Sequence, residues 1–299
     1  MVFIRDSSYG MSCGLTGILM TASLIHRYSG IEMWRQMCQD ILTYFTQHDP
    51  MPKNPDIIFG PAALLKLLCL NKELREYPGA EAVMHKAADQ LLAMRQESPR
   101  LWLTIDKKRY LSGAAHGQSG IGTALALAGS FLDRQDLAEA ADDALHYEAK
   151  LYSPKLKGWP DLRRIALPDS SMHGYCSGAP GIGMNALQRG TEDPYGLLPL
   201  AIDSCLHHKL LPLDHFCCGN SAAVDFLLEA GRKLNDQSLI IKSRDILSAF
   251  SSRADQNGGY QFSDKNHRPV GIPTLFFGNA GVGYVLLRQI DEDLVTLML

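Results

Sequence analysis

Four side chains that could bind a metal or transfer protons lie one or two residues before a glycine. Each of these glycines is followed by an apolar run. His116 lies one residue before such a glycine, Cys176 two residues before another, and the adjacent Cys217 and Cys218 directly before a third. Thiolates are good ligands for Zn²⁺, and a catalytic zinc keeps three protein ligands and one open position. A thiol entering that position would lose its proton near neutral pH and become a nucleophile. The residues therefore predict a three-cysteine zinc site.

A purely structural role for these residues is the alternative. A lone cysteine is usually a small buried hydrophobe, and this interpretation suits the remaining cysteines, Cys13, Cys38, Cys69 and Cys205. The adjacent pair lacks the common Cys-x-x-Cys ligand spacing, and a single histidine before a helix is usually structural. The four residues share one kind of turn, and this coincidence favours a functional role.

That turn recurs along the chain. Each copy has a glycine, then a glycine or alanine three or four positions later, and then an apolar helical run; the copies lie at residues 13–18, 59–64, 116–121, 177–182, 218–223 and 277–282. Small residues at the start of a helix let backbones approach closely and leave N–H groups facing a shared centre. Six such turns indicate a repeated helical architecture.

The stretches between the turns have apolar residues at helical spacing. Trp34, Met37, Cys38, Ile41 and Leu42 form one such stripe, and a second contains Ala82, Leu91 and Leu92. Each repeat therefore predicts an apolar inner helix followed by an amphipathic outer helix. Repeated inner and outer helices favour an all-α fold, an α/α toroid. Strand signals are sparse, and only residues 260–262 could form a short strand.

Composition excludes several classes of protein. The chain has 299 residues, of which 46% are hydrophobic, a net charge of -3 and a pI near 6.4. It has no long basic tract, so nucleic-acid binding is not expected. We expect no signal peptide and no membrane span, because the longest apolar run is too short to cross a bilayer. Seven cysteines without a regular framework favour a reducing, cytoplasmic location.

Several motifs resemble those of one enzyme family. Residues 115–121 are similar to its Ala-His-Gly motif, residues 176–182 to its Cys-x-Gly-x-Pro-Gly-Ile motif, and residues 216–220 to its third metal-binding motif. Residues 158–163 and 277–284 match it as well. The chain therefore resembles the lanthionine synthetase C-like family over nearly its whole length, and in particular the cyclase domain of class II lanthipeptide synthetases.

The resemblance implies an α/α toroid with a catalytic Zn²⁺ ligated by Cys176, Cys217 and Cys218. The implied reaction adds cysteine thiols of a dehydrated precursor peptide to dehydroalanine or dehydrobutyrine, forming thioether rings. Asp56 falls where the family has an active-site aspartate. His116 is the expected proton donor to the enolate, because imidazole can act as an acid near neutral pH.

Two further histidines and one substitution bear on this assignment. His173 and His215 lie close to the ligands in sequence, so they are alternative proton donors or supports for the ligands. Cys218 stands where the usual third motif has histidine. The resulting Cys-Cys-Gly form resembles the three-thiolate subgroup, which is known for wide substrate tolerance.

The chain also departs from the family pattern. Met172 stands where some members carry an arginine, Tyr175 replaces the usual tryptophan, and Ser177 replaces an aromatic residue or histidine. These changes affect the surroundings of the zinc ligands rather than the ligands themselves.

The family toroid has seven inner helices, whereas six glycine turns occur here. We therefore expect the first helical hairpin to be missing, which would expose the sides of the helices after Gly14 and Gly278 and favour self-association or docking on a partner. Residues 1–299 are expected to form a cyclase domain without a dehydratase domain, so the dehydratase would be a separate or missing partner.

Two other functions remain open at this point. One is a different zinc–thiol enzyme on an α/α barrel, such as a protein prenyltransferase subunit, but these use mixed carboxylate, cysteine and histidine ligands. The other is a degenerate toroid without catalytic activity that binds a peptide or a small thiol such as glutathione. A cyclisation assay with a dehydrated peptide separates the cyclase from this second alternative.

Overall fold

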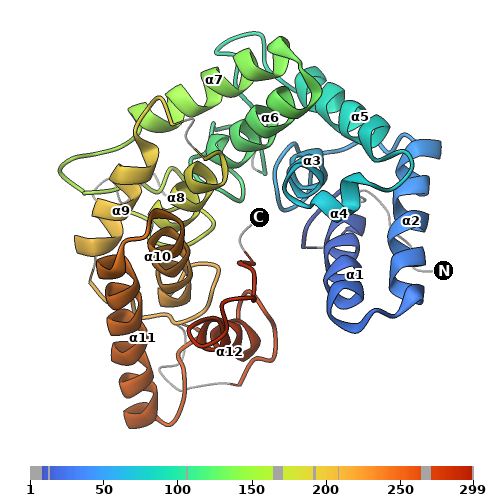
Figure 1. The fold of residues 1–299 in the computed structure, drawn as a ribbon. Helices are drawn as coiled ribbons and strands as arrows, with labels where there is room; N and C mark the ends of the chain where they lie inside the picture. Colours follow the sequence, from blue (N-terminus) through green and yellow to red (C-terminus); the bar gives the residue numbers. More distant parts are fainter. Residues whose placement is uncertain are drawn as a thin grey trace. The chain divides into compact units, whose positions relative to one another are not determined.

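The structure, a computed structural model, describes residues 9–12, 14–105, 107–163, 171–190, 193–207, 209–263 and 271–297. These residues form helices and only isolated β-bridges, so the all-α prediction is confirmed and residues 260–262 form no strand (Figure 1). The helices are α1 (Leu15–Ser29), α2 (Glu32–Gln47), α3 (Pro61–Leu70), α4 (Lys72–Arg75), α5 (Ala80–Ala93), α6 (Gln118–Leu132), α7 (Gln135–Lys150), α8 (Ala179–Gln188), α9 (Leu197–His207), α10 (Asn220–Leu234), α11 (Gln237–Asn257) and α12 (Asn279–Arg288).

A helix follows each of the six predicted glycine turns. The N-cap positions of these six helices are Gly14, Gly60, Gly117, Gly178, Gly219 and Gly278, all with extended backbone. The sequences that follow are apolar or small, so nearly every residue of α8 and most residues of α6 and α10 are buried. A helix that is buried on all sides belongs to the interior of a helical protein. These are the inner helices that the repeat predicts.

An amphipathic helix follows five of the inner helices in the described chain. On α2, Cys38, Ile41 and Leu42 are buried as predicted. On α5 the prediction is wrong for Ala82, which is exposed, while the buried face begins at the next residue, Val83. The predicted helical period of α5 is correct. Which of its sides is buried, however, depends on how α5 packs against α3.

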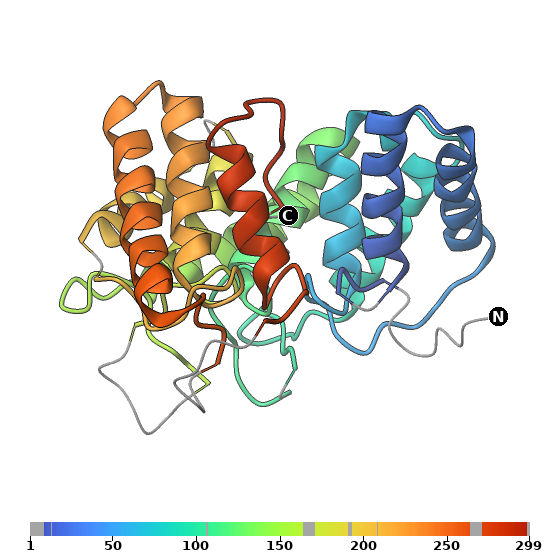
Figure 2. The same ribbon diagram turned by 90° about the horizontal axis from the view of Figure 1, so that it is seen from below.

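Two compact units divide the chain. Among the described residues, the first comprises those within 9–111 and 115–148, and the second those within 112–114 and 149–297. In the first unit α3 packs against α1, α5 and α6, and in the second α10 packs against α8, α11 and α12. Inner and outer helices of one repeat run side by side, as α1 with α2 and α10 with α11 show in both views (Figure 2).

Backbone hydrogen bonds join neighbouring turns within each unit. In the first unit, Met11 N–H donates to the carbonyl of Ile57, and Ile57 N–H donates to that of Ala115. In the second unit, Cys176 N–H donates to the carbonyl of Cys217. The turns that open the inner helices therefore lie next to one another, and this arrangement sets the positions of the side chains they carry.

The last inner helix, α12, keeps part of its apolar surface exposed. Leu286 is 39% exposed and Leu287 52%, and Ile290 just beyond the helix is 82% exposed. A shallow hollow lined by Gly283, Tyr284 and these residues lies on this surface. The missing first hairpin stays a prediction. Within the described residues, no helix is both long and apolar enough to cross a membrane.

Candidate metal centre and histidine–aspartate pair

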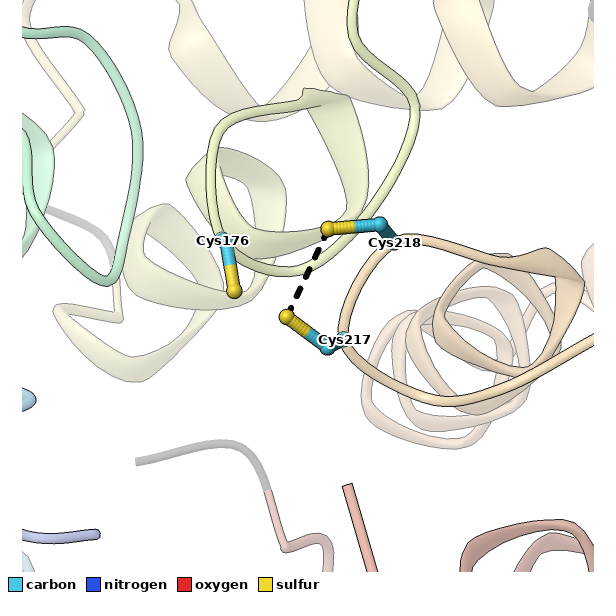
Figure 3. A group of neighbouring side chains, drawn as sticks. All are labelled: Cys176, Cys217 and Cys218. Atoms are coloured by element: carbon cyan, nitrogen blue, oxygen red, sulfur yellow. Dashed lines mark hydrogen bonds between the residues drawn. The ribbon is translucent and has the colours of Figure 1, made fainter. Parts of the chain in front are cut away.

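Three cysteine thiols converge in the second unit. Cys176 lies in the turn before α8, and Cys217 and Cys218 lie in the turn before α10 (Figure 3). All three Sγ atoms lie within 4.8 Å of one another, and the two adjacent sulfurs are 3.4 Å apart. Cys176 and Cys217 are buried, and Cys218 is half-buried. The structure thus brings together the three residues that the sequence singled out as ligands.

Gly174 allows the two cysteine-bearing turns to meet. A Cβ atom at this position would lie 2.4 Å from Cα of Cys218 and 2.5 Å from the carbonyl oxygen of Cys217, so only glycine fits. The close approach lets Cys176 N–H donate to the Cys217 carbonyl at 3.2 Å, and Cys217 N–H donates to the carbonyl of Phe276 at 2.9 Å. In the sequence, only its place two residues before a cysteine distinguishes Gly174 from other glycines.

The turn that carries Cys217 and Cys218 is anchored by the buried carboxylate of Asp214. Its Oδ1 atom accepts hydrogen bonds from Asn220 Nδ2 at 2.9 Å and from Arg253 Nη2 at 2.5 Å. Its Oδ2 atom accepts from the backbone N–H of Gln261 at 2.9 Å. Asp214 thereby ties this turn to α10, to α11 and to the segment after α11; no local pattern predicts this role, because two of its three partners are distant in sequence.

His215 supports the same turn. Its Nδ1 atom lies 3.2 Å from the backbone N–H of Cys218 and accepts that hydrogen bond, so any proton on the neutral ring resides on Nε2. The ring is buried and packs against Phe277 at 5.5 Å between centroids. Burial lowers the pKa of His215. These contacts favour a supporting role over proton donation. The other alternative donor, His173, has its Nε2 atom 2.6 Å from the Ser171 hydroxyl.

The chemistry of the three thiols fits zinc. Hydrogen bonds from the thiols of Cys176 and Cys217 lower the pKa of Cys218, whereas hydrogen bonds with Cys217 and Cys218, together with burial, raise the pKa of Cys176. One of the three thiols therefore loses its proton readily, but three thiolates at these distances would repel one another. A divalent cation at their centre would remove that repulsion, and Zn²⁺ accepts three thiolates and leaves a fourth position open.

The other cysteines differ from this group. Cys38 and Cys205 are buried, as expected, but Cys69 is only half-buried, and Cys13 lies outside the described residues. Burial raises the pKa of Cys38 to about 11 and that of Cys69 to about 12. Such cysteines remain protonated thiols near neutral pH and behave as apolar side chains.

His116 and Asp56 form a pair in the first unit. The Asp56 carboxylate is buried: its Oδ1 atom accepts from the backbone N–H of Phe59 at 2.8 Å, and its Oδ2 atom lies 2.9 Å from His116 Nδ1. The His116 side chain is 16% exposed and stacks on the ring of Phe59. The carboxylate accepts the Nδ1 proton, which leaves Nε2 as the atom that can exchange a proton with a substrate.

The residues that depart from the family pattern also lie in the second unit. Tyr175 is buried, and its ring centroid lies 6.3 Å from that of Phe216 and 6.0 Å from that of Phe276, so it fills an aromatic cluster beside the cysteine turns. Ser177 is buried between Cys176 and the N-cap of α8. The sulfur of Met172 lies 3.7 Å from Nη2 of Arg163.

Comparison with solved structures shows the fold. Nisin cyclase shares 16% sequence identity with the chain at a TM-score of 0.70, covering 96% of this chain and 77% of that protein. Cellobiose 2-epimerase from Bacillus thermoamylovorans B4167 shares 10% identity at a TM-score of 0.55, with coverages of 86% and 80%. D-mannose isomerase shares 12% identity at a TM-score of 0.55, with coverages of 85% and 79%. These likenesses confirm the predicted fold class, the α/α toroid.

Sequence comparison shows the family. No curated protein sequence matches the chain. The family model described as lanthionine synthetase C-like protein, however, matches residues 4–299, and this span contains the three cysteines, His116 and Asp56. Because the match extends over nearly the whole chain, the chain belongs to the lanthionine synthetase C-like family.

Proposed function

We propose that the chain is a zinc-dependent lanthipeptide cyclase. It would add cysteine thiols of a dehydrated precursor peptide to dehydroalanine or dehydrobutyrine, forming lanthionine or methyllanthionine rings. The observation that carries the proposal is the convergence of three cysteine sulfurs within 4.8 Å in a member of this family. The structural likeness to nisin cyclase supports a peptide as the substrate.

Cys176, Cys217 and Cys218 would hold the metal. Bound there, Zn²⁺ would supply the charge that keeps a cysteine thiol of the substrate deprotonated near neutral pH. The protein's part is to keep the three sulfurs together and shielded, which the close approach at Gly174 and the hydrogen bonds of Asp214 accomplish. We also propose that the site belongs to the Cys-Cys-Gly subgroup and therefore accepts a wide range of substrates.

His116 would deliver the proton. In the addition, a carbon–sulfur bond forms, the carbon–carbon double bond of the dehydro residue is lost, and the proton that the thiol gives up is replaced by one on the α-carbon. Atoms and electrons balance without an oxidant or reductant. His116 would donate from Nε2, while Asp56 holds the ring through Nδ1 at 2.9 Å and stabilises the protonated imidazole.

A cyclase of this kind would need a dehydrated substrate and a reducing surrounding. Residues 1–299 would act as a cyclase domain, and its substrate would be a precursor peptide that a dehydratase has already modified. A reducing cytoplasm would keep the three cysteines available as ligands, because these thiols would otherwise be open to oxidation.

A thiol-counting assay tests the function. The zinc-loaded chain is incubated with a peptide that contains one dehydroalanine and one cysteine, and the remaining thiol is alkylated with N-ethylmaleimide before mass spectrometry. Ring closure leaves the peptide mass unchanged but removes the alkylation site, so the adduct should disappear. Cys217→Ala serves as the control. Full alkylation after incubation with zinc-loaded protein would instead favour the toroid that only binds a peptide or a small thiol.

A further inference from the structure

Phe277 lies in the turn before α12, at the position that Cys218 and His116 occupy in their own turns. Each of the three residues directly precedes the N-cap glycine of an inner helix, and each of these glycines has an extended backbone. The turns also share one hydrogen bond, in which the N–H after the glycine donates to the carbonyl seven residues earlier: Gln118 to Leu111 at 2.9 Å, Asn220 to Leu213 at 3.0 Å and Asn279 to Ile272 at 2.7 Å. The three side chains therefore extend from the same position of equivalent turns, yet Phe277 has no part in the proposed mechanism.

The turn of Phe277 is attached to the turn of the proposed metal ligands. Cys217 N–H donates to the carbonyl of Phe276 at 2.9 Å. The centroid of the Phe276 ring lies 5.7 Å from that of Phe216 and 6.0 Å from that of Tyr175. Because a backbone hydrogen bond and two ring contacts fix the chain at Phe276, the next side chain, Phe277, has a defined place beside the ligand turn.

Only one imidazole ring separates the Phe277 ring from the backbone of Cys218. The ring centroids of Phe277 and His215 are 5.5 Å apart, and His215 Nδ1 accepts from the backbone N–H of Cys218 at 3.2 Å. Phe277 is 54% exposed, whereas the nearby Tyr175 and Phe216 are 2% and 1% exposed. Single exposed apolar side chains are common on protein surfaces, but the position of Phe277 beside the candidate ligands distinguishes it from the others.

We infer that Phe277 is a specificity-determining residue, which contacts an apolar side chain next to the reacting cysteine of the precursor peptide. The inference rests on the proposed function, because it assumes that the substrate thiol binds at Cys176, Cys217 and Cys218. Consecutive residues of an extended peptide are about 3.3–3.6 Å apart, so a residue one or two positions from that cysteine comes within reach of the Phe277 ring. An aromatic side chain offers a large apolar area in a defined orientation, which suits it to anchor a peptide.

The test measures peptide binding without ring closure. Zinc-loaded full-length protein is titrated into fluorescein-labelled peptides that contain one cysteine, no dehydro residue, and phenylalanine, serine or lysine on both sides of the cysteine; anisotropy gives the Kd. Wild type should bind the phenylalanine peptide about 10-fold more tightly than the serine peptide, because partial burial of an aromatic side chain contributes roughly that factor. Phe277→Ala should abolish this preference, and Phe277→Leu should keep part of it. Circular dichroism checks that each variant folds.

Phe277→Glu adds a result that a merely structural role would not produce. A carboxylate in place of the ring should weaken binding of the phenylalanine peptide and create a preference for the lysine peptide, because opposite charges attract. High salt should reduce this new preference. Phe131→Ala is the matched control: Phe131 is 48% exposed in the last turn of α6, at the opposite end of that helix from the turn of His116, so the peptide preference should stay unchanged.

The outcomes separate this inference from the proposed function. Equal or absent binding of the three peptides by wild type, or a wild-type preference that survives in Phe277→Ala, would overturn the role of Phe277 and leave the cyclase to the thiol-counting assay. Weaker Zn²⁺ binding by both Phe277→Ala and Phe277→Leu in chelator competition would also overturn it, because the ring would then support His215 instead. A wild type that shows the preference and loses it in Phe277→Ala, yet closes no ring in the thiol-counting assay, would support the peptide contact and overturn the cyclase function.

Discussion

The Nδ1 atom of His116 lies 2.9 Å from Oδ2 of Asp56, and that carboxylate is completely buried. The two residues are far apart in sequence but sit in turns that share a backbone hydrogen bond between Ile57 and Ala115. The contact gives the imidazole one tautomer and one orientation. A histidine held in this way is prepared to exchange protons through Nε2.

Replacing His116 should impair proton delivery without unfolding the protein. We expect His116→Asn to retain zinc and to slow ring closure by about 10²- to 10⁴-fold, the usual contribution of general acid–base catalysis. Asp56→Asn should also slow the reaction, because the amide no longer stabilises the protonated ring. The thiol-counting assay under single-turnover conditions measures both rates. An unchanged rate in His116→Asn would remove this histidine from the mechanism.

Removing any one of the three converging cysteines should lower metal content. Purified wild type should hold about one zinc per chain, in keeping with a three-ligand site. Cys176→Ala, Cys217→Ala and Cys218→Ala should each reduce occupancy, measured by elemental analysis after anaerobic, chelator-free purification. Cys69→Ala is the control, since this half-buried thiol lies in the other unit. A zinc-free wild type would contradict the prediction.

Gly174→Ala should separate the two cysteine-bearing turns. Its Cβ would lie 2.4 Å from Cα of Cys218, a distance that forces the backbone to shift. We expect a loss of about 1–3 kcal/mol in the free energy of unfolding and weaker zinc binding in chelator competition. Gly283→Ala on α12 is the comparison: its Cβ meets no atom within 4 Å, so stability should be unchanged or up to about 1 kcal/mol higher. Equal behaviour of the two variants would show that Gly174 is not a packing constraint.

Removing one partner of a buried ion pair should strongly destabilise the protein. Arg288 pairs with Asp225 and with Glu229 at 2.5 Å, and Thr296 Oγ1 donates to Asp225 Oδ2 at 2.6 Å, so the pair also ties the C-terminal segment to α10 and α12. Arg288→Met would leave Asp225 buried and unpaired, at a cost of about 3–5 kcal/mol. Arg288→Met combined with Asp225→Leu should recover most of this loss.

The pH dependence of that variant gives a second check. Burial raises the pKa of Asp225, and losing the charge of Arg288 should raise it further. The folded protein then holds the Asp225 proton more tightly than the unfolded chain does. Stability should therefore fall as pH rises above the unfolded carboxyl value of about 4. Urea unfolding at several pH values should show a deficit that grows towards neutral pH; a deficit independent of pH would contradict this account.

The apolar surface of α12 should promote self-association. Leu287 is 52% exposed within a hollow that Tyr284 and Ile290 also line. We expect light scattering to detect association of the wild type that Leu287→Glu weakens. Ile241→Glu on α11 is the control, because Ile241 is 51% exposed but lies outside this hollow. A monodisperse wild-type monomer would show the prediction to be wrong.

Local patterns explain why much of the fold was predictable. A glycine followed by small residues and an apolar run identifies the start of an inner helix from the nearest residues alone, as at Gly117, Gly178 and Gly219. The recurrence of that turn then suggested which cysteines could meet. The prediction for Ala82 is wrong because it needed more than local pattern. The period of a helix follows from its own residues, but the side that is buried is set by the helix packed against it.

By itself, the sequence determined the helical repeat, the residue types at each turn and the three candidate ligands. The tertiary structure alone decided that Gly174 must lack a side chain and that His215 supports the turn of Cys218. The hydrogen bonds by which Asp214 anchors this turn are likewise known only from the tertiary structure. The physical reason is that these features depend on contacts between distant segments. Hydrogen bonds and charges act over a few ångströms, and only the folded chain brings those segments within reach.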